Sequence, residues 1–330
     1  MATNFSPSHC ESDCREIHDS FGGVSSLVRA LVAKTTLVDR RRIRETYKTM
    51  YGEDLLSHLQ RLKVMLSGRG EKFSVKTCEG LALWMVDPCE RDACLAKEAI
   101  EQNEVDYGAL VEMFVGRKSS HFLMIKQAYQ TRFRSLLDQD IAGLEPPHPY
   151  QRILAALSTS HKAHHADVSQ DIAKTDAIRL YQTGEGSSGR VNEAVVLEIL
   201  SKRSICQLKL TFACYKRIYG HSYTRQFKKA DSTQFEEAIE SLVKCISHPP
   251  KYYAEMLQRS LTDGASKKRS LIRIMVSRAE VDMGDIQREF RVKYGVELKD
   301  AICKSIPPGD YRDFLLALSN NNAFSGSQHH

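Results

Sequence analysis

The apolar and aromatic residues of this chain recur at a spacing of four, and the same pattern occurs four times. Each copy begins with an apolar or β-branched residue, continues with two aromatic residues and closes with an apolar or aromatic residue. A spacing of four returns side chains to one face of an α-helix, so each copy predicts a helix with one buried face. The copies lie at residues 43–55, 125–137, 211–223 and 286–298, and their leading aromatic residues are Tyr47, Tyr129, Tyr215 and Phe290.

In three of the four copies a glycine directly follows the second aromatic residue, at Gly52, Gly220 and Gly295. A glycine at this position takes up a positive φ and ends the helix. The leading aromatic residues are separated by 82, 86 and 75 residues along the chain. A supersecondary unit that recurs at such a steady interval is typical of a repeat architecture.

The rest of the sequence also reads as helical, because no stretch combines alternating apolar and polar residues with β-branched enrichment. Each unit has room for four or five short helices, which bury their apolar faces against one another. We therefore expect an all-α protein. Its expected parts are an N-terminal arm at 1–13, repeats at 14–86, 87–160, 170–248 and 249–319, a linker at 161–169 and a disordered tail at 320–330.

The composition restricts the class of protein, its cellular compartment and its charged partners. With 42% hydrophobic residues among 330, the chain can bury one sizeable core or several small ones. No run approaches eighteen apolar residues, and the N-terminus lacks the order of a signal peptide. Nine scattered cysteines favour reduced thiols in the cytoplasm over a disulfide framework. A net charge of +6 suits an anionic membrane surface or RNA.

Four stretches of the sequence resemble the annexin family, and the resemblance extends over about residues 12–319. Residues 271–283 read LIRIMVSRAEVDM and are similar to the signature of the family's fourth repeat, while residues 309–318 read GDYRDFLLAL and are similar to its closing helix. Residues 83–93 read LWMVDPCERDA, residues 245–254 read CISHPPKYYA, and both are similar to the plant branch. The resemblance implies a curved disc of four repeats of about five helices each.

The resemblance also implies a function, namely calcium-dependent binding to anionic phospholipids through loops on the convex face. Calcium is a hard cation that takes oxygen ligands from carbonyls, carboxylates and water. The family's loop reads Gly-x-Gly-Thr, and an Asp or Glu follows about forty residues later. The glycines allow the backbone to turn its carbonyls toward the ion.

The first and fourth repeats have lost the distant carboxylate. Its position holds Met65 in the first repeat and Ile306 in the fourth, and neither side chain replaces a carboxylate for a hard ion. In the fourth repeat Lys267, Lys268 and Arg269 follow the loop. These charges repel calcium, and we expect them either to contact an anionic headgroup or to be an ordinary solvated face.

The third repeat is the best candidate for calcium, with weak or partial binding. It combines Gly186, Gly189 and Val191 in a glycine-rich loop with Asp231 forty residues later, although a plain flexible loop also explains this pattern. The second repeat has no loop glycine but retains Glu145 at the carboxylate position, where a solvated loop acid is the alternative.

Other charged groups have structural and functional interpretations. Four residues match the buried polar lining of the family's central channel, namely Asp92, Glu112, Arg117 and Arg278. Charge pairing alone explains them, and a role in ion conduction is the alternative. The helix carrying Arg40–Arg42 and Arg44 predicts a solvated face rather than a nucleic-acid patch, because no aromatic platform is interleaved. Trp84 is expected in the core.

We therefore expect a plant-type annexin that binds anionic membranes peripherally from the cytoplasm, without a nucleic-acid partner and with weakened calcium dependence. Self-association on membranes stays open. The alternatives are calcium-independent lipid binding and a protein-interaction scaffold. An enzyme, either a peroxidase or a nucleotide phosphatase, is not expected. The position of the haem ligand suggested for plant members holds Lys34, and a Walker-type phosphate loop is absent from the sequence.

Overall fold

The computed structural model describes residues 7–32, 36–162, 168–187, 191–227, 232–262 and 268–320. The chain forms two compact units, one made of Met1–Pro88 with Tyr253–His330 and the other of Cys89–Tyr252. All regular structure in the described residues is helical, which confirms the prediction of an all-α protein. No helix in this part of the chain is long and apolar enough to span a bilayer.

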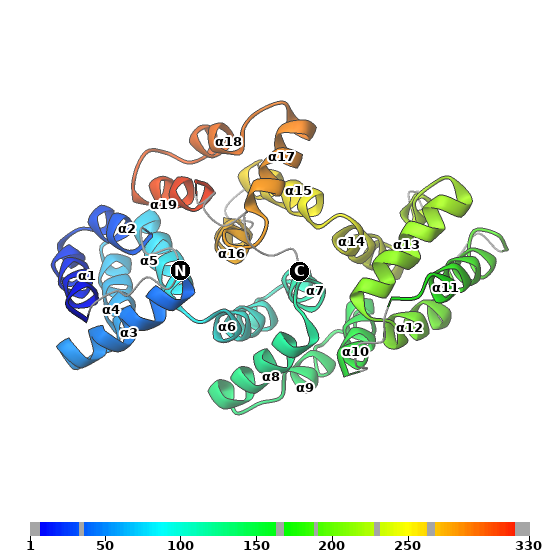
Figure 1. The fold of residues 1–330 in the computed structure, drawn as a ribbon, viewed down its shortest axis with the longest axis horizontal. Helices are drawn as coiled ribbons and strands as arrows, with labels where there is room; N and C mark the ends of the chain where they lie inside the picture. The colour runs from blue at the N-terminus through cyan, green and yellow to red at the C-terminus, as the bar shows by residue number, and fades with distance from the viewer. Residues whose placement is uncertain are drawn as a thin grey trace. The chain divides into compact units, whose positions relative to one another are not determined.

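The first unit takes its helices from both ends of the chain (Figure 1). Its last helix, α19, packs against α2 and α5 near the start. Gly80 in α5 makes this approach possible, because a Cβ there would collide with the ring of Phe314. The elements are α1 (Pro7–Asp19), η1 (Ser20–Gly22), α2 (Val24–Val32), α3 (Leu37–Tyr51), α4 (Leu55–Gly68), α5 (Lys72–Met85), α15 (Pro249–Thr262), α16 (Lys268–Arg278), α17 (Met283–Tyr294), α18 (Leu298–Ser305) and α19 (Asp310–Ser319).

The second unit is one continuous part of the chain. Its helices pack in neighbouring groups, in which α10 contacts α7, α9, α12 and α14, and α11 lies along α13. The elements are α6 (Pro88–Glu101), α7 (Tyr107–Gly116), α8 (Ser119–Phe133), α9 (Leu137–Ala142), α10 (Pro149–Lys162), α11 (Gln170–Gln182), α12 (Glu193–Lys202), α13 (Ile205–Tyr219), η2 (Tyr223–Phe227) and α14 (Gln234–Ser247).

The four copies of the sequence pattern form the equivalent helices α3, α8, α13 and α17. All four leading aromatic residues are completely buried, and the closing residue of each copy begins the next helical element. The predicted glycine stops adopt φ of 70°, 77° and 71° at Gly52, Gly220 and Gly295. The second copy, which has no glycine there, ends at Arg134 with a φ of 56°, so it uses the same left-handed stop.

Part of the expected N-terminal arm belongs to a helix, α1. It begins at Pro7, inside the residues expected to form an arm, and packs on α3. Cys10, Cys14 and Ile17 form its buried face, and the Cys10 thiol donates a hydrogen bond to Thr46 at 3.3 Å. The buried face was missed because two of its three members are thiols, whose spacing was not counted as apolar. At the expected linker, α10 likewise continues to Lys162.

Arg40 corrects the expectation of a solvated arginine face. Its side chain is completely buried, and its two terminal nitrogens donate to the two carboxylate oxygens of Glu280 at 3.0 and 2.7 Å. The guanidinium carbon lies 4.1 Å from the ring centroid of Trp84, which is itself buried as predicted. Nearby, Arg41 and Arg44 pair with Asp87 and Asp54. A buried charge needs such a partner, and this one lies 240 residues away.

Candidate functional site

The loop after α11 in the third repeat is a compact turn. The carbonyl of Tyr181 accepts hydrogen bonds from the amides of Gly184 (3.1 Å) and Gly186 (2.8 Å), which fold the chain back on the end of the helix. A Cβ at Gly186 would lie 2.6 Å from the Tyr181 ring, and the φ of Gly186 is not in the left-handed region. Glycine is therefore required here for close packing rather than for an unusual backbone conformation.

Glu185 ties this loop to the C-terminal end of α13. The Tyr215 hydroxyl donates to one carboxylate oxygen of Glu185 at 3.1 Å, and His221 Nε2 lies 3.6 Å from the other. Burial raises the pKa of Tyr215, and the nearby Glu185 carboxylate raises it further. The rings of Tyr181 and Tyr219 stack at 3.9 Å. These contacts fix the loop on a rigid helix.

The segment that enters α12 meets the start of α14. The amide of Val191 donates to Glu236 at 3.5 Å, and the other carboxylate oxygen of Glu236 accepts from the amide of Thr233 at 2.9 Å. The Thr233 side chain accepts from the Glu236 amide, which completes a capping box. Glu236 was not among the predicted site residues, although the Thr-x-x-Glu spacing at 233–236 was a readable signal of a helix start.

Two of the predicted calcium ligands, Gly189 and Asp231, lie outside the described residues, as does Lys34. The segments on either side of them are described, and the Val191–Glu236 contact joins these segments. This contact places Val191 at the start of α14, and in the sequence Asp231 precedes Glu236 by five residues.

In the second repeat Glu145 is exposed and lies in the loop before α10. Three stacked rings join the start of α7 to the start of α10. The ring centroid of Tyr107 lies 4.6 Å from that of His148 and 5.0 Å from that of Tyr150. Burial lowers the pKa of His148. The cluster therefore joins these two helix starts, and no contact is seen in the described residues between Glu145 and the segment at 102–105.

The first and fourth repeats provide no carboxylate at the expected positions. Met65 is 45% exposed in α4, whereas Ile306 is buried after α18. Among the predicted membrane contacts, Lys267 lies outside the described residues, and Lys268 and Arg269 begin α16 with side chains outside the described part.

The first repeat has a hydrogen-bonded cluster that the sequence interpretation missed. The Tyr47 hydroxyl lies 2.9 Å from Nδ1 of both His18 and His58. His18 stacks on Tyr51 at 3.9 Å, and His58 stacks on Phe21 at 3.6 Å. Burial, reinforced by the charge of Arg61, lowers the pKa of His58. The partners are 29 and 11 residues from Tyr47, so no local motif reveals them.

The predicted polar core residues are largely buried and paired within their own units. Arg117 donates two hydrogen bonds to Asp92, one of them at 3.1 Å, and Glu112 on α7 is buried. In the other unit, Arg278 bonds to Asp282 at 2.8 Å and lies 4.5 Å over the Tyr253 ring. Charge pairing explains Asp92, Arg117 and Arg278 in structural terms.

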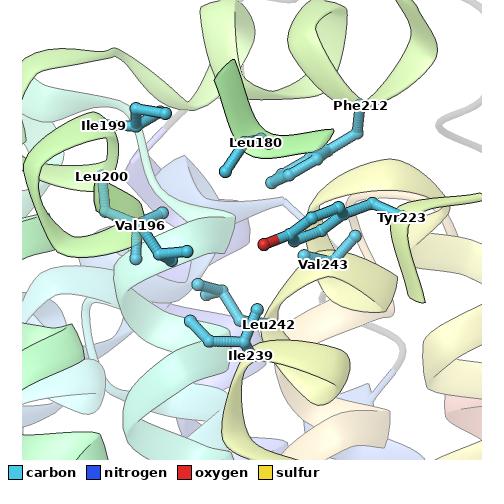
Figure 2. A pocket seen from close by; sticks show the side chains of 9 residues that line it. All are labelled: Leu180, Val196, Ile199, Leu200, Phe212, Tyr223, Ile239, Leu242 and Val243. Carbon is cyan, nitrogen blue, oxygen red and sulfur yellow. The ribbon is translucent and has the colours of Figure 1, made fainter. Parts of the chain in front are cut away.

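A small apolar pocket lies in the core of the third repeat (Figure 2). The Tyr223 hydroxyl points into it, where the other three copies of the sequence pattern have leucine. Burial raises the pKa of Tyr223, so the phenol stays neutral. The lining is otherwise aliphatic or aromatic, so the pocket offers a metal or an anion no charged group. Its residues are Leu180, Val196, Ile199, Leu200, Phe212, Tyr223, Ile239, Leu242 and Val243.

Oxygen donors are the groups of the predicted calcium sites that could bind a metal ion. Within the described ranges, no group of three or more His, Cys, Asp or Glu side chains is arranged to hold a metal ion. The third repeat instead brings the amide of Val191 to the Glu236 carboxylate, whose oxygens are donors of the type that calcium takes.

Comparisons with known proteins agree with this fold. The annexin family model matches residues 175–242 and 252–318. Human annexin A13 is 31% identical over 312 residues, which cover 93% of this chain and 94% of that protein. Rabbit annexin A11 is 32% identical over 321 residues; they cover 97% of this chain, but the chain spans only 61% of that relative.

A strawberry annexin-like protein, RJ4, is 28% identical over 323 residues, covering 96% of this chain and 98% of that protein. Animal and plant relatives are therefore similarly close, and the plant branch is not singled out. The solved structure of annexin III has a TM-score of 0.80 and 29% identity, with 96% of this chain and 95% of that chain covered. This chain belongs to the annexin family.

Proposed function

We propose that this annexin binds anionic phospholipid surfaces peripherally, and that the third repeat supplies its main calcium-dependent contact. The observation that supports this is the hydrogen bond between Val191 and Glu236, which joins the glycine-rich loop to the segment that follows Asp231. Loop carbonyls at Gly186, Gly189 and Val191 and the carboxylate of Asp231 would hold the ion, with Glu236 as a further oxygen donor. When bound, calcium supplies positive charge that a lipid phosphate can share.

The other repeats contribute less to calcium binding in this proposal. Glu145 is a weaker second site, because its loop partner at 102–105 has no glycine. Lys267, Lys268 and Arg269 would add calcium-independent attraction, worth about 1 kcal/mol per basic residue near an anionic surface. We therefore expect a cytoplasmic protein that binds membranes peripherally and whose binding depends only partly on calcium. The plant-type motif at 83–93 supports, as part of the same proposal, membership of the plant branch.

Co-sedimentation with vesicles of phosphatidylserine and phosphatidylcholine tests this proposal. We expect the protein to pellet with calcium and to pellet less with chelator. Asp231→Asn should remove most of the difference and Glu236→Gln part of it, while Asp300→Asn, an exposed acid on α18, should leave it unchanged. Pelleting that ignores chelator would reject the calcium mechanism, and no pelleting at all would favour a scaffold that binds neither ligand.

A further inference from the structure

The third repeat contains the longest stretch of the chain without an acidic residue. Between Glu198 and Asp231 the sequence has eight Lys or Arg residues and no Asp or Glu. This stretch includes all of α13 and η2. Since the whole chain has a net charge of only +6, an acid-free stretch with eight positive charges is a strong local concentration.

Most of the described charges in this stretch are not neutralised. Lys202 and Arg203 pair with Glu198 and Asp176 at 2.7 and 2.6 Å. The other four described cations are exposed, and none forms an ion pair with a described carboxylate; they are Lys209, Lys216, Arg217 and Arg225. We call these four residues the basic stripe.

The equivalent helices of the other repeats show that the fold does not require this charge. In α17, Arg288, Arg291 and Lys293 pair with Asp285, Glu297 and Glu255, respectively. In α8 the cations Lys126 and Arg132 are also paired, and Leu123 and Met124 are exposed. Neither α8 nor α17 therefore has an equivalent of the basic stripe.

The spacing of the stripe fits an extended chain of phosphates. Lys209 and Lys216 are seven residues apart, which places them on one side of α13 about 10 Å from each other. Arg217 lies next to Lys216, and Arg225 follows in η2. At this end of the helix the half-buried ring of Tyr219 stacks on Tyr181. Cations along a helix and just beyond its end, with an aromatic ring beside them, are the combination that binds single-stranded nucleic acid.

We propose that the basic stripe binds single-stranded nucleic acid, with the cations on the phosphates and Tyr219 against a base. This function is additional to membrane binding and needs no calcium. It also revises the expectation that nucleic acid is not a partner, which was based on the arginines around Arg40. Those arginines are mostly paired, whereas the stripe is not.

Fluorescence anisotropy with a labelled 20-nucleotide oligouridine RNA, in chelator and at several salt concentrations, tests the proposal. Four phosphate contacts predict a slope of about −3 for the logarithm of affinity against the logarithm of salt concentration. The variant Lys209→Gln, Lys216→Gln, Arg225→Gln should weaken binding at least tenfold and reduce the slope by about 2. Tyr219→Leu should weaken binding about tenfold, whereas Tyr219→Phe keeps the ring and should bind normally.

A charge-matched control separates a specific surface from general attraction. The variant Lys48→Gln, Lys72→Gln, Lys299→Gln removes the same charge from exposed positions elsewhere and should retain RNA binding. An equal loss in this control would overturn the proposal, as would failure of the unmodified protein to bind at low salt. If the stripe variant loses binding to phosphatidylserine vesicles in chelator but retains RNA binding, the stripe is a membrane contact and the proposal is wrong.

Discussion

The Tyr215 hydroxyl reaches out of the helical core of the third repeat and donates to Glu185 in the loop after α11, at 3.1 Å. The other copies of the pattern use the same position differently. Tyr129 donates to Asp140 at 2.5 Å, Tyr47 lies between two histidines, and Phe290 has no hydroxyl. One buried ring position therefore anchors a different neighbouring polar group in each of three repeats.

Tyr215→Phe should lower the free energy of unfolding by about 1 kcal/mol, because it removes one hydrogen bond to a partly exposed carboxylate. It should also weaken calcium binding by the third repeat, since the loop loses its anchor. Urea unfolding and calorimetric calcium titration measure the two effects. Tyr219→Phe, on the same helix, is the control. An unchanged calcium affinity in Tyr215→Phe would show that the loop does not depend on this bond.

Gly186→Ala should destabilise the protein by about 1–3 kcal/mol, because the new methyl group collides with the Tyr181 ring. Gly22→Ala adds a methyl group where no heavy atom lies within 4 Å, so its effect should stay within about 0.5 kcal/mol. Thermal unfolding of both variants tests the comparison. Equal midpoints for the two variants would contradict the close packing at Gly186.

The left-handed conformation at the helix ends predicts changes in stability of opposite sign for two substitutions. Arg134→Gly should stabilise the protein by about 0.5–1 kcal/mol, since a left-handed conformation costs glycine little. Gly220→Ala should destabilise it by about 1 kcal/mol for the same reason. Chemical unfolding of the two variants should move the midpoint in opposite directions, and a shift in one direction for both would reject this reason.

Arg40→Met should be the most destabilising of these changes, at about 3–5 kcal/mol, because it leaves Glu280 without its buried partner. The exposed neighbour Arg42 is the matched control, and Arg42→Met should change stability by less than about 0.5 kcal/mol. Circular dichroism during urea unfolding measures both variants. A small effect at Arg40 would mean that the pair contributes little beyond packing.

Acid should destabilise the first repeat through His58. Its pKa is lowered in the folded protein, so the unfolded chain binds the proton more readily. Stability is therefore full above the unfolded pKa of about 6.5 and decreases as the pH falls from there through the folded pKa. The melting temperature should decrease from pH 7.5 through 6.5 to 5.5, and this decrease should be smaller in His58→Gln. His148, whose pKa shifts in the same direction, accounts for part of the remaining slope.

Local periodicity predicted the local structure well. The spacing around Tyr47, Tyr129, Tyr215 and Phe290 identified four helices with buried faces, and three glycine stops were placed correctly. Long-range pairing was not predictable in this way. The partner of Arg40 is 240 residues away, and a helical spacing does not show which end of the chain provides a carboxylate.

The candidate site was harder to predict than the fold for a related reason. The loop and the distant carboxylate are separate in sequence, and the contact that joins them runs through Glu236, whose capping role is local. The spacing gave Asp231 as the acid, which remains a prediction. The cluster of His18, Tyr47 and His58 was not predictable, because the spacing identifies Tyr47 only as a buried helix residue and its partners lie 29 and 11 residues away.

The first compact unit combines Met1–Pro88 with Tyr253–His330, whereas Cys89–Tyr252 is continuous. A ribosome adds about 5–20 residues per second, so Glu280 emerges roughly 10–40 seconds after Pro88. During synthesis the middle of the chain can complete its core while the first segment still lacks its partner. Arg40 and Trp84 then lie on a surface whose partner has not yet been synthesised, the condition under which two nascent chains can exchange their C-terminal segments.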